Sequence, residues 1–170
     1  AGAGKLTMAL EHQFYNGPWD LNADATRWNG FLRWHWENEQ DKINITFMGY
    51  HGKWKSTDQV PLRAIEDGTL GRFGFIDPTN GGNSQRYSLS FDWEHREGRT
   101  TTRANAYAGY YDLDLFSNFT YFEESISRGD MLGDQFEQKD GRWFVGGGVA
   151  RDWRFDALGH EQRVTLGFAM

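Results

Sequence analysis

The feature that most constrains the fold of this 170-residue chain is a two-residue alternation of apolar and polar side chains, which recurs seven times. The clearest example lies at residues 86–94, where Tyr87, Leu89, Phe91 and Trp93 alternate with polar residues. Successive side chains of a β-strand point to opposite faces, so the pattern predicts an antiparallel sheet with one apolar and one polar face. The chain is therefore predicted to be all-β, an antiparallel meander of about seven strands near 5–15, 27–37, 43–54, 85–96, 99–111, 142–155 and 162–170.

The predicted connections alternate between short and long. Residues 55–84 and 112–141 form two long loops, whereas the other predicted turns, at 38–42, 96–99 and 156–161, are short. Loops of such length are unusual inside a compact domain. Short turns on one side and long loops on the other are typical of outer-membrane β-barrels, whose long loops are extracellular. The pattern thus favours strands that cross a membrane.

Two architectures share the alternation. In a soluble barrel of the lipocalin type the apolar face points inward, whereas in a membrane barrel it points outward to lipid. Aromatic residues bracket the apolar positions of three strands, six to ten residues apart, a spacing close to the ~9–11 residues of a tilted membrane-crossing strand. These pairs are Trp28 and Trp36, Tyr87 and Trp93, and Trp143 and Trp153. Such pairs are typical of the aromatic girdles at both membrane surfaces, so the membrane barrel is favoured and the lipocalin-type ligand-binding module is the alternative.

Composition excludes several other classes. The chain has no cysteine, so it offers neither disulfides nor thiolate metal ligands. A net charge of -6 argues against a nucleic-acid partner, and an aromatic content of 16% is foreign to disordered chains. No apolar run approaches the ~20 residues that a transmembrane helix needs.

Several segments resemble one known family. They are FMGYHGKWKSTDQVP at 47–61, DQVPLRAIEDGTLGRFGFIDPTNGGNSQRYSLSFDW at 58–93, LDLFSNFTYF at 113–122 and GDQFEQKDGR at 133–142. They are similar to loops and strands of TonB-dependent outer-membrane receptors. The resemblance implies a barrel of about twenty-two strands with an N-terminal plug inside it.

Bacterial single-chain barrels have an even number of strands, so seven strands fit a part of such a barrel. No plug is recognised in these residues. The resemblance further implies a bacterial outer-membrane location and import of a small nutrient, such as a siderophore, cobalamin or sugar. The implied partners are membrane lipid, lipopolysaccharide and, through the plug, the TonB complex that supplies the energy.

Candidate site residues fall into two groups. Polar positions on the strands are expected to line the lumen: Arg33, Asp92, Glu94 and Arg103. By family analogy, the long loops bind the ligand, with candidates Asp58, Arg63, Arg72, Asp77, Asn83, Asp112, Asp114 and Tyr121. The plainer interpretation is that a water-filled lumen needs polar side chains and that Asp and Asn favour turns.

No catalytic group, metal site or cofactor is predicted. The five histidines lack the spacing of metal ligands, and no nucleophile motif stands out. A carbohydrate-active β-sandwich enzyme would suit the aromatic content, but a placed pair of carboxylates is not recognisable. The two architectures differ in the orientation of residues 86–94. In the membrane barrel the apolar face of this strand points outward, and in the lipocalin-type module the polar face does.

Overall fold

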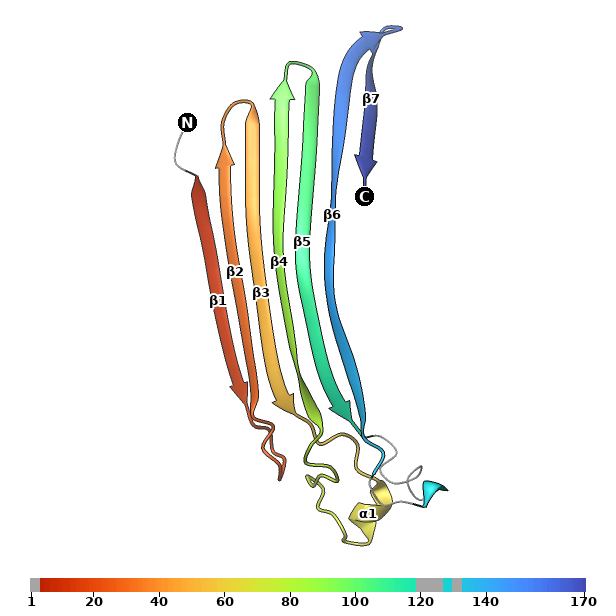
Figure 1. Cartoon of the computed structure of the whole chain (residues 1–170). Helices are drawn as coiled ribbons and strands as arrows, with labels where there is room; N and C mark the ends of the chain where they lie inside the picture. The colour runs from red at the N-terminus through yellow and green to blue at the C-terminus, as the bar shows by residue number, and fades with distance from the viewer. Residues whose placement is uncertain (1–3, 119–126, 130–132) are drawn as a thin grey trace.

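Seven long strands form a single antiparallel sheet in which each strand pairs with its neighbours in the sequence (Figure 1). The structure, a computed structural model, describes residues 4–118, 127–129 and 133–170. The strands are β1 (Lys5–Tyr15), β2 (Ala25–Glu37), β3 (Asp41–Lys55), β4 (Gly81–Glu97), β5 (Thr100–Ser117), β6 (Phe136–Ala157) and β7 (His160–Ala169). A short helix, α1 (Leu62–Glu66), lies in the connection between β3 and β4. The predicted all-β class and seven-stranded antiparallel meander are confirmed.

The loop-side ends of three strands extend beyond the predicted ranges. β4 begins at Gly81, β5 continues to Ser117 and β6 begins at Phe136, so the long connections shorten to 56–80 and 118–135. Alternation of apolar residues stops earlier, but the backbone ladder continues through pairs such as Asn83 with Asp114. Backbone pairing does not require an apolar side chain, so a sequence pattern based on apolar spacing ends before the strand does.

The connections are unequal at the two ends of the sheet. The connections 16–24 and 56–80 and the facing ends of β5 and β6 lie at the lower end in Figure 1, and the three tight turns lie at the upper end. One of these turns places both Leu158 (φ 56°) and Gly159 (φ 78°) in the left-handed region, as a two-residue type I′ hairpin requires.

The two faces of the sheet differ in composition along the whole meander. We call the face that carries Leu89 the apolar face and the face that carries Ser90 the polar face. The ladder registers align apolar residues of successive strands into rows, for example Met8, Leu32, Phe47, Leu89, Ala108 and Val145. Large apolar side chains in such rows are exposed, at 75% for Leu10 and 52% for Leu89.

Burial is inverted with respect to a soluble domain. Among the described residues, Ala23 is the only buried hydrophobic residue, at 8% exposure. The buried polar residues are Asn44, Asn80, Ser84, Ser117, Asn118 and Asp152. The sheet therefore has no apolar core between layers.

The sheet is open. β1 and β7 are its two edges, and the ladder runs from β1 to β7 without joining them. The strand at residues 6–14 therefore does not pair with the strand at 164–170.

Candidate functional site

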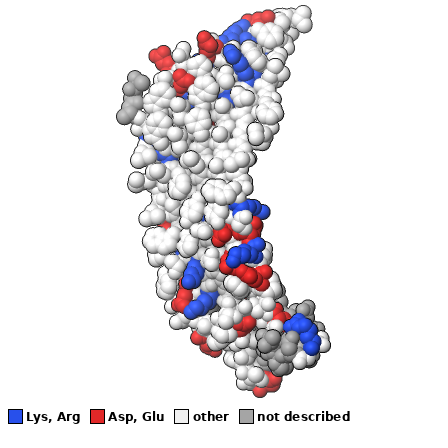
Figure 2. Space-filling model, in the orientation of Figure 1, with Lys and Arg blue, Asp and Glu red and all other residues white. Residues whose placement is uncertain are grey.

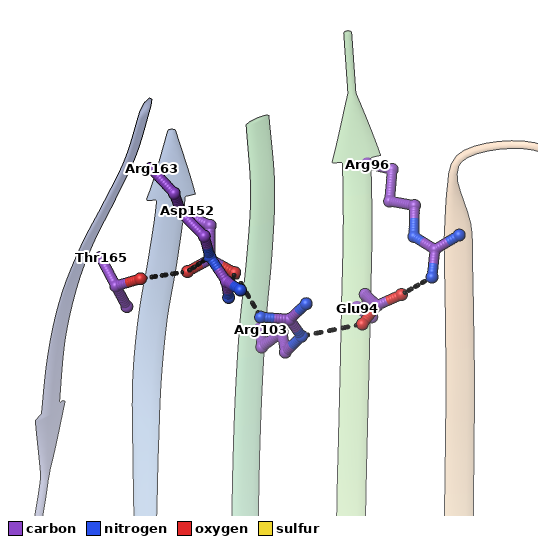
Figure 3. Close-up of polar contacts among 6 residues, drawn as sticks. All are labelled: Glu94, Arg96, Arg103, Asp152, Arg163 and Thr165. Atoms are coloured by element: carbon purple, nitrogen blue, oxygen red, sulfur yellow. Dashed lines mark hydrogen bonds and ion pairs between the residues drawn. The ribbon is translucent and has the colours of Figure 1, made fainter. Parts of the chain in front are cut away.

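The polar face near the short turns carries a network of ion pairs that links four strands (Figure 3). Asp152 on β6 is its hub, with a side chain only 4% exposed. Its carboxylate accepts hydrogen bonds from Arg103 of β5, from Arg163 of β7 at 2.9 Å and from Thr165 at 2.6 Å. Arg103 also donates to Glu94 of β4 at 2.9 Å. The network fixes neighbouring strands side by side through charge-assisted hydrogen bonds.

The predicted lumen residues lie together on this face. Arg33, Asp92, Glu94 and Arg103 line one hollow of about 720 Å³, together with Asn44 and other residues of β3 to β7. Arg33 donates to the side-chain oxygen of Asn44 at 2.8 Å, and the Asn44 side chain is buried beneath it. The structure thus brings four residues from three strands to a single polar hollow, although nothing in it assigns that hollow a ligand.

The half of the polar face nearer the loops has a different chemistry. The ladder places Tyr50, Arg86, Tyr111 and Arg142 in one cross-strand row from β3 to β6. The guanidinium carbon of Arg142 lies 5.2 Å from the ring centre of Tyr111, and that of Arg86 lies 5.8 Å from the ring centre of Phe144. These distances are those of cation–π contacts. Sequence reasoning did not select this row, although Tyr and Phe at polar positions of the alternation were a visible signal.

A second hollow, of about 470 Å³, adjoins the row. Its lining includes Tyr50 and Arg86 from the row, with Phe31, Met48 and Asn29 from the same face. The polar face therefore combines a charged network near the turns with an aromatic and arginine-rich surface near the loops.

A polar cluster holds the two long connections together. Asp58 accepts a hydrogen bond from the side-chain amide of Asn80 at 2.8 Å and one from the backbone N–H of Asn118 at 3.3 Å. Asp77 accepts from the side-chain amide of Asn118 at 3.2 Å, and Gln135 donates to Asn80 at 3.1 Å. Asn80 and Asn118 are 1% and 2% exposed. Two of the predicted ligand-binding residues, Asp58 and Asp77, thus make contacts that organise the loops.

The other predicted loop residues are dispersed. Arg63 and Arg72 are exposed near α1. Asn83, Asp112 and Asp114 lie in β4 and β5 rather than in loops, at positions of the apolar face, because the strands extend past the apolar alternation. Tyr121 lies outside the described residues.

Hydrogen bonding lowers the pKa of the Asp77 carboxyl group. Partial burial acts to raise this pKa, but hydrogen bonds from Thr79 and Asn118 outweigh it. A carboxyl group whose pKa is lower in the folded state contributes stability above its unfolded pKa of about 3.9, and that stability is lost as the pH falls through the folded pKa.

Acidification below about pH 4 is therefore expected to loosen the loop cluster before the strands. The rate of amide hydrogen exchange in the 56–80 segment, corrected for the intrinsic pH dependence of exchange, should rise as the pH falls from about 5 to about 3. An Asp77→Asn variant should show faster exchange at pH 5 and a smaller further change on acidification. Equal pH dependence in both proteins would contradict the role assigned to Asp77.

Comparison of the chain with protein families, with curated proteins and with solved structures gave no match. In the described part of the chain no helix is long and apolar enough to cross a membrane. The same residues contain no cluster of His, Asp or Glu suited to hold a metal ion.

Proposed function

We propose that this chain forms seven consecutive membrane-spanning strands of a bacterial outer-membrane barrel of about twenty-two strands, of the TonB-dependent receptor type. The observation that carries the proposal is the inverted distribution of side chains, with large apolar groups exposed on one face and polar groups buried on the other. A continuous apolar face of this kind is unfavourable in water and favourable against lipid.

The rows of the apolar face support a membrane-facing band. On its loop side, one row aligns Tyr87, Tyr110 and Trp143. On its turn side, another row aligns Trp36, Ile43 and Trp93. Aromatic rings at both borders of an apolar band match the two girdles of a membrane barrel. In Figure 2 charged side chains gather toward both ends of the molecule and are sparse over a stretch between them.

The midpoint of the apolar band shifts relative to the ladder register between β2 and β6. Such a shift is expected if the strands are tilted relative to the membrane normal. On β2 it runs from Trp28 to Trp36, and its midpoint aligns through the ladder with Val145 of β6. On β6 the aromatic residues that border it are Trp143 and Trp153, whose midpoint lies three residues beyond Val145. With about 3.4 Å per residue and about 4.8 Å between strands, this shift corresponds to a tilt of about 30°. Membrane barrels have tilts of about 35–45°.

Arg151 is an exception on the apolar face of β6. Its guanidinium carbon lies 5.7 Å from the ring centre of Trp153. That position suits a long basic side chain that keeps its charge at the membrane surface while its stem lies along apolar groups.

In the intact receptor, the polar face would line the lumen and the long connections would face the cell exterior. The receptor would import a small nutrient with energy from the TonB complex, and lipid and lipopolysaccharide would surround its apolar face. A binding and transport role, rather than catalysis, is proposed. The lipocalin-type alternative requires a closed cavity lined by the apolar face. Among the described residues, hollows of about 720 and 470 Å³ adjoin the polar face, and a hollow of about 350 Å³ adjoins the apolar face near Val145 and Phe168.

Single-cysteine labelling tests the orientation, because these 170 residues contain no cysteine. In isolated outer membranes of cells that make the protein, Leu89→Cys should react with a lipid-soluble maleimide and resist a charged, water-soluble thiosulfonate. Ser90→Cys, one residue away on the other face, should show the opposite preference. Gly98→Cys, in a short turn, is a control for water access. Reaction of Leu89→Cys with the charged reagent alone, or absence of the protein from the outer membrane, would overturn the proposal.

A further inference from the structure

The loop-side half of the polar face contains an arginine that is not neutralised. No carboxylate pairs with Arg86 in the part of the chain that the structure describes, and its guanidinium carbon lies 5.8 Å from the centre of the Phe144 ring. Near the turns, by contrast, Arg96, Arg103 and Arg163 each pair with a carboxylate. An unpaired cation that projects into a hollow can accept an anionic partner without first breaking an internal ion pair.

Arg86 has an aromatic neighbour on each of the two adjacent strands. Tyr50 of β3 and Tyr111 of β5 are its direct cross-strand partners. Since adjacent strands lie about 4.8 Å apart, the backbones of the two tyrosines are about 10 Å apart, one on each side of Arg86. The Tyr111 ring already has the Arg142 guanidinium over it, whereas Tyr50 lines the same hollow as Arg86. A planar ring in this hollow can therefore lie beside Tyr50 while an anionic group of the same molecule reaches Arg86.

The nearby acidic group does not oppose an anion at this position. Glu11 also lines the hollow, but its carboxylate pairs with Arg27 at 2.7 Å. Phe31 and Met48 supply apolar surface next to the row, and Asn29 and Ser88 supply polar groups. Arg142 adds a second positive charge at the end of the row, although it is shared with Asp140 at 3.4 Å.

We propose that Tyr50 and Arg86, side by side in the second hollow, bind a small ligand that carries both an anionic group and an unsaturated ring. This inference rests on the proposed function and narrows its substrate class. A carboxylate, phosphate or phenolate would form charge-assisted hydrogen bonds with Arg86, and the ring would pack against a tyrosine. A neutral sugar could accept hydrogen bonds from Arg86 but would form no ion pair with it.

Equilibrium dialysis of three small probes tests this class with protein purified from outer membranes in detergent. Benzoate has the ring and the charge, benzamide has the ring alone, and acetate has the charge alone. Benzoate should bind more tightly than either of the others. Arg86→Gln should weaken benzoate binding about tenfold and leave benzamide unchanged, as expected for the loss of a hydrogen bond to a charged group. Tyr50→Leu should reduce the advantage of benzoate over acetate.

Arg154→Gln is the matched control, since Arg154 is an exposed arginine of the same face but lies near the turns, away from the aromatic row. It should leave the binding of all three probes unchanged. Arg86→Lys, which keeps the charge, should retain a preference for benzoate over benzamide. Absence of the protein from the outer membrane would overturn the proposed function and this inference together. Two results with protein that is present in the outer membrane would overturn this inference alone. One is that benzoate binds no better than benzamide. The other is that Arg154→Gln weakens benzoate binding as much as Arg86→Gln does.

Discussion

Arginine in place of Leu89 is expected to destabilise the membrane-inserted protein by about 2–4 kcal/mol. Leu89 lies between the two aromatic borders of the apolar face, in the row that contains Phe47 and Ala108, and is 52% exposed. If this face meets lipid, the charge would lie near the middle of the hydrocarbon, where no water or carboxylate can solvate it. The free energy of unfolding in guanidinium, measured with the protein in phospholipid vesicles, gives the effect directly.

Ser90→Arg is the matched control for this change. Ser90 follows Leu89 in β4 and lies on the polar face, opposite Thr46 and Tyr107. In a water-filled lumen an added arginine is expected to change the free energy of unfolding by less than about 0.5 kcal/mol. Similar losses of unfolding free energy in the two variants would mean that both faces meet the same solvent, and the membrane interpretation would fail.

Alanine in place of Gly81 is expected to produce the second large effect, a loss of about 2–4 kcal/mol of folding free energy. Gly81 begins β4 with a φ of 144°, a conformation that residues with a Cβ rarely adopt. An added Cβ would lie 2.3 Å from the backbone oxygen of Trp54 and 2.8 Å from the Cα of Lys55. Backbone atoms of a paired strand cannot move aside, so the start of β4 must shift.

The shift should extend into the loop cluster, because the neighbouring Asn80 accepts a backbone hydrogen bond from Ser56 at 3.1 Å and donates to Asp58. Gly81→Ala should therefore lower the denaturation midpoint and speed hydrogen exchange in the 56–80 segment. Gly30→Ala is the control, since nothing lies within 4 Å of its added Cβ. It is expected to change stability by less than about 0.5 kcal/mol. An equal loss in both variants would show that any glycine-to-alanine change in these strands is costly, and would refute the specific role of Gly81.

The residues that sequence reasoning selected differ in how well their positions could be foreseen. Arg33, Asp92, Glu94 and Arg103 were placed on one face by strand parity, and they do line one hollow. Asn83, Asp112 and Asp114 were assigned to loops, but they continue the ladders of β4 and β5. Strand parity is a local property, whereas the point at which a strand ends depends on hydrogen bonds to a distant neighbour.

Alternation in the sequence by itself determined the all-β class, the seven strands, their antiparallel order and the membership of each residue in one face. The class and the faces follow from a fixed two-residue period, and the antiparallel pairing at the three tight turns follows from connections too short for crossovers. Only the tertiary structure decided that Asp152 is shared by Arg103, Arg163 and Thr165, and that Arg86 lies between Tyr50 and Tyr111. Those neighbours come from different strands of the sheet. Their contacts depend on the register between strands, which a repeating two-residue pattern leaves free to slide by two residues at a time.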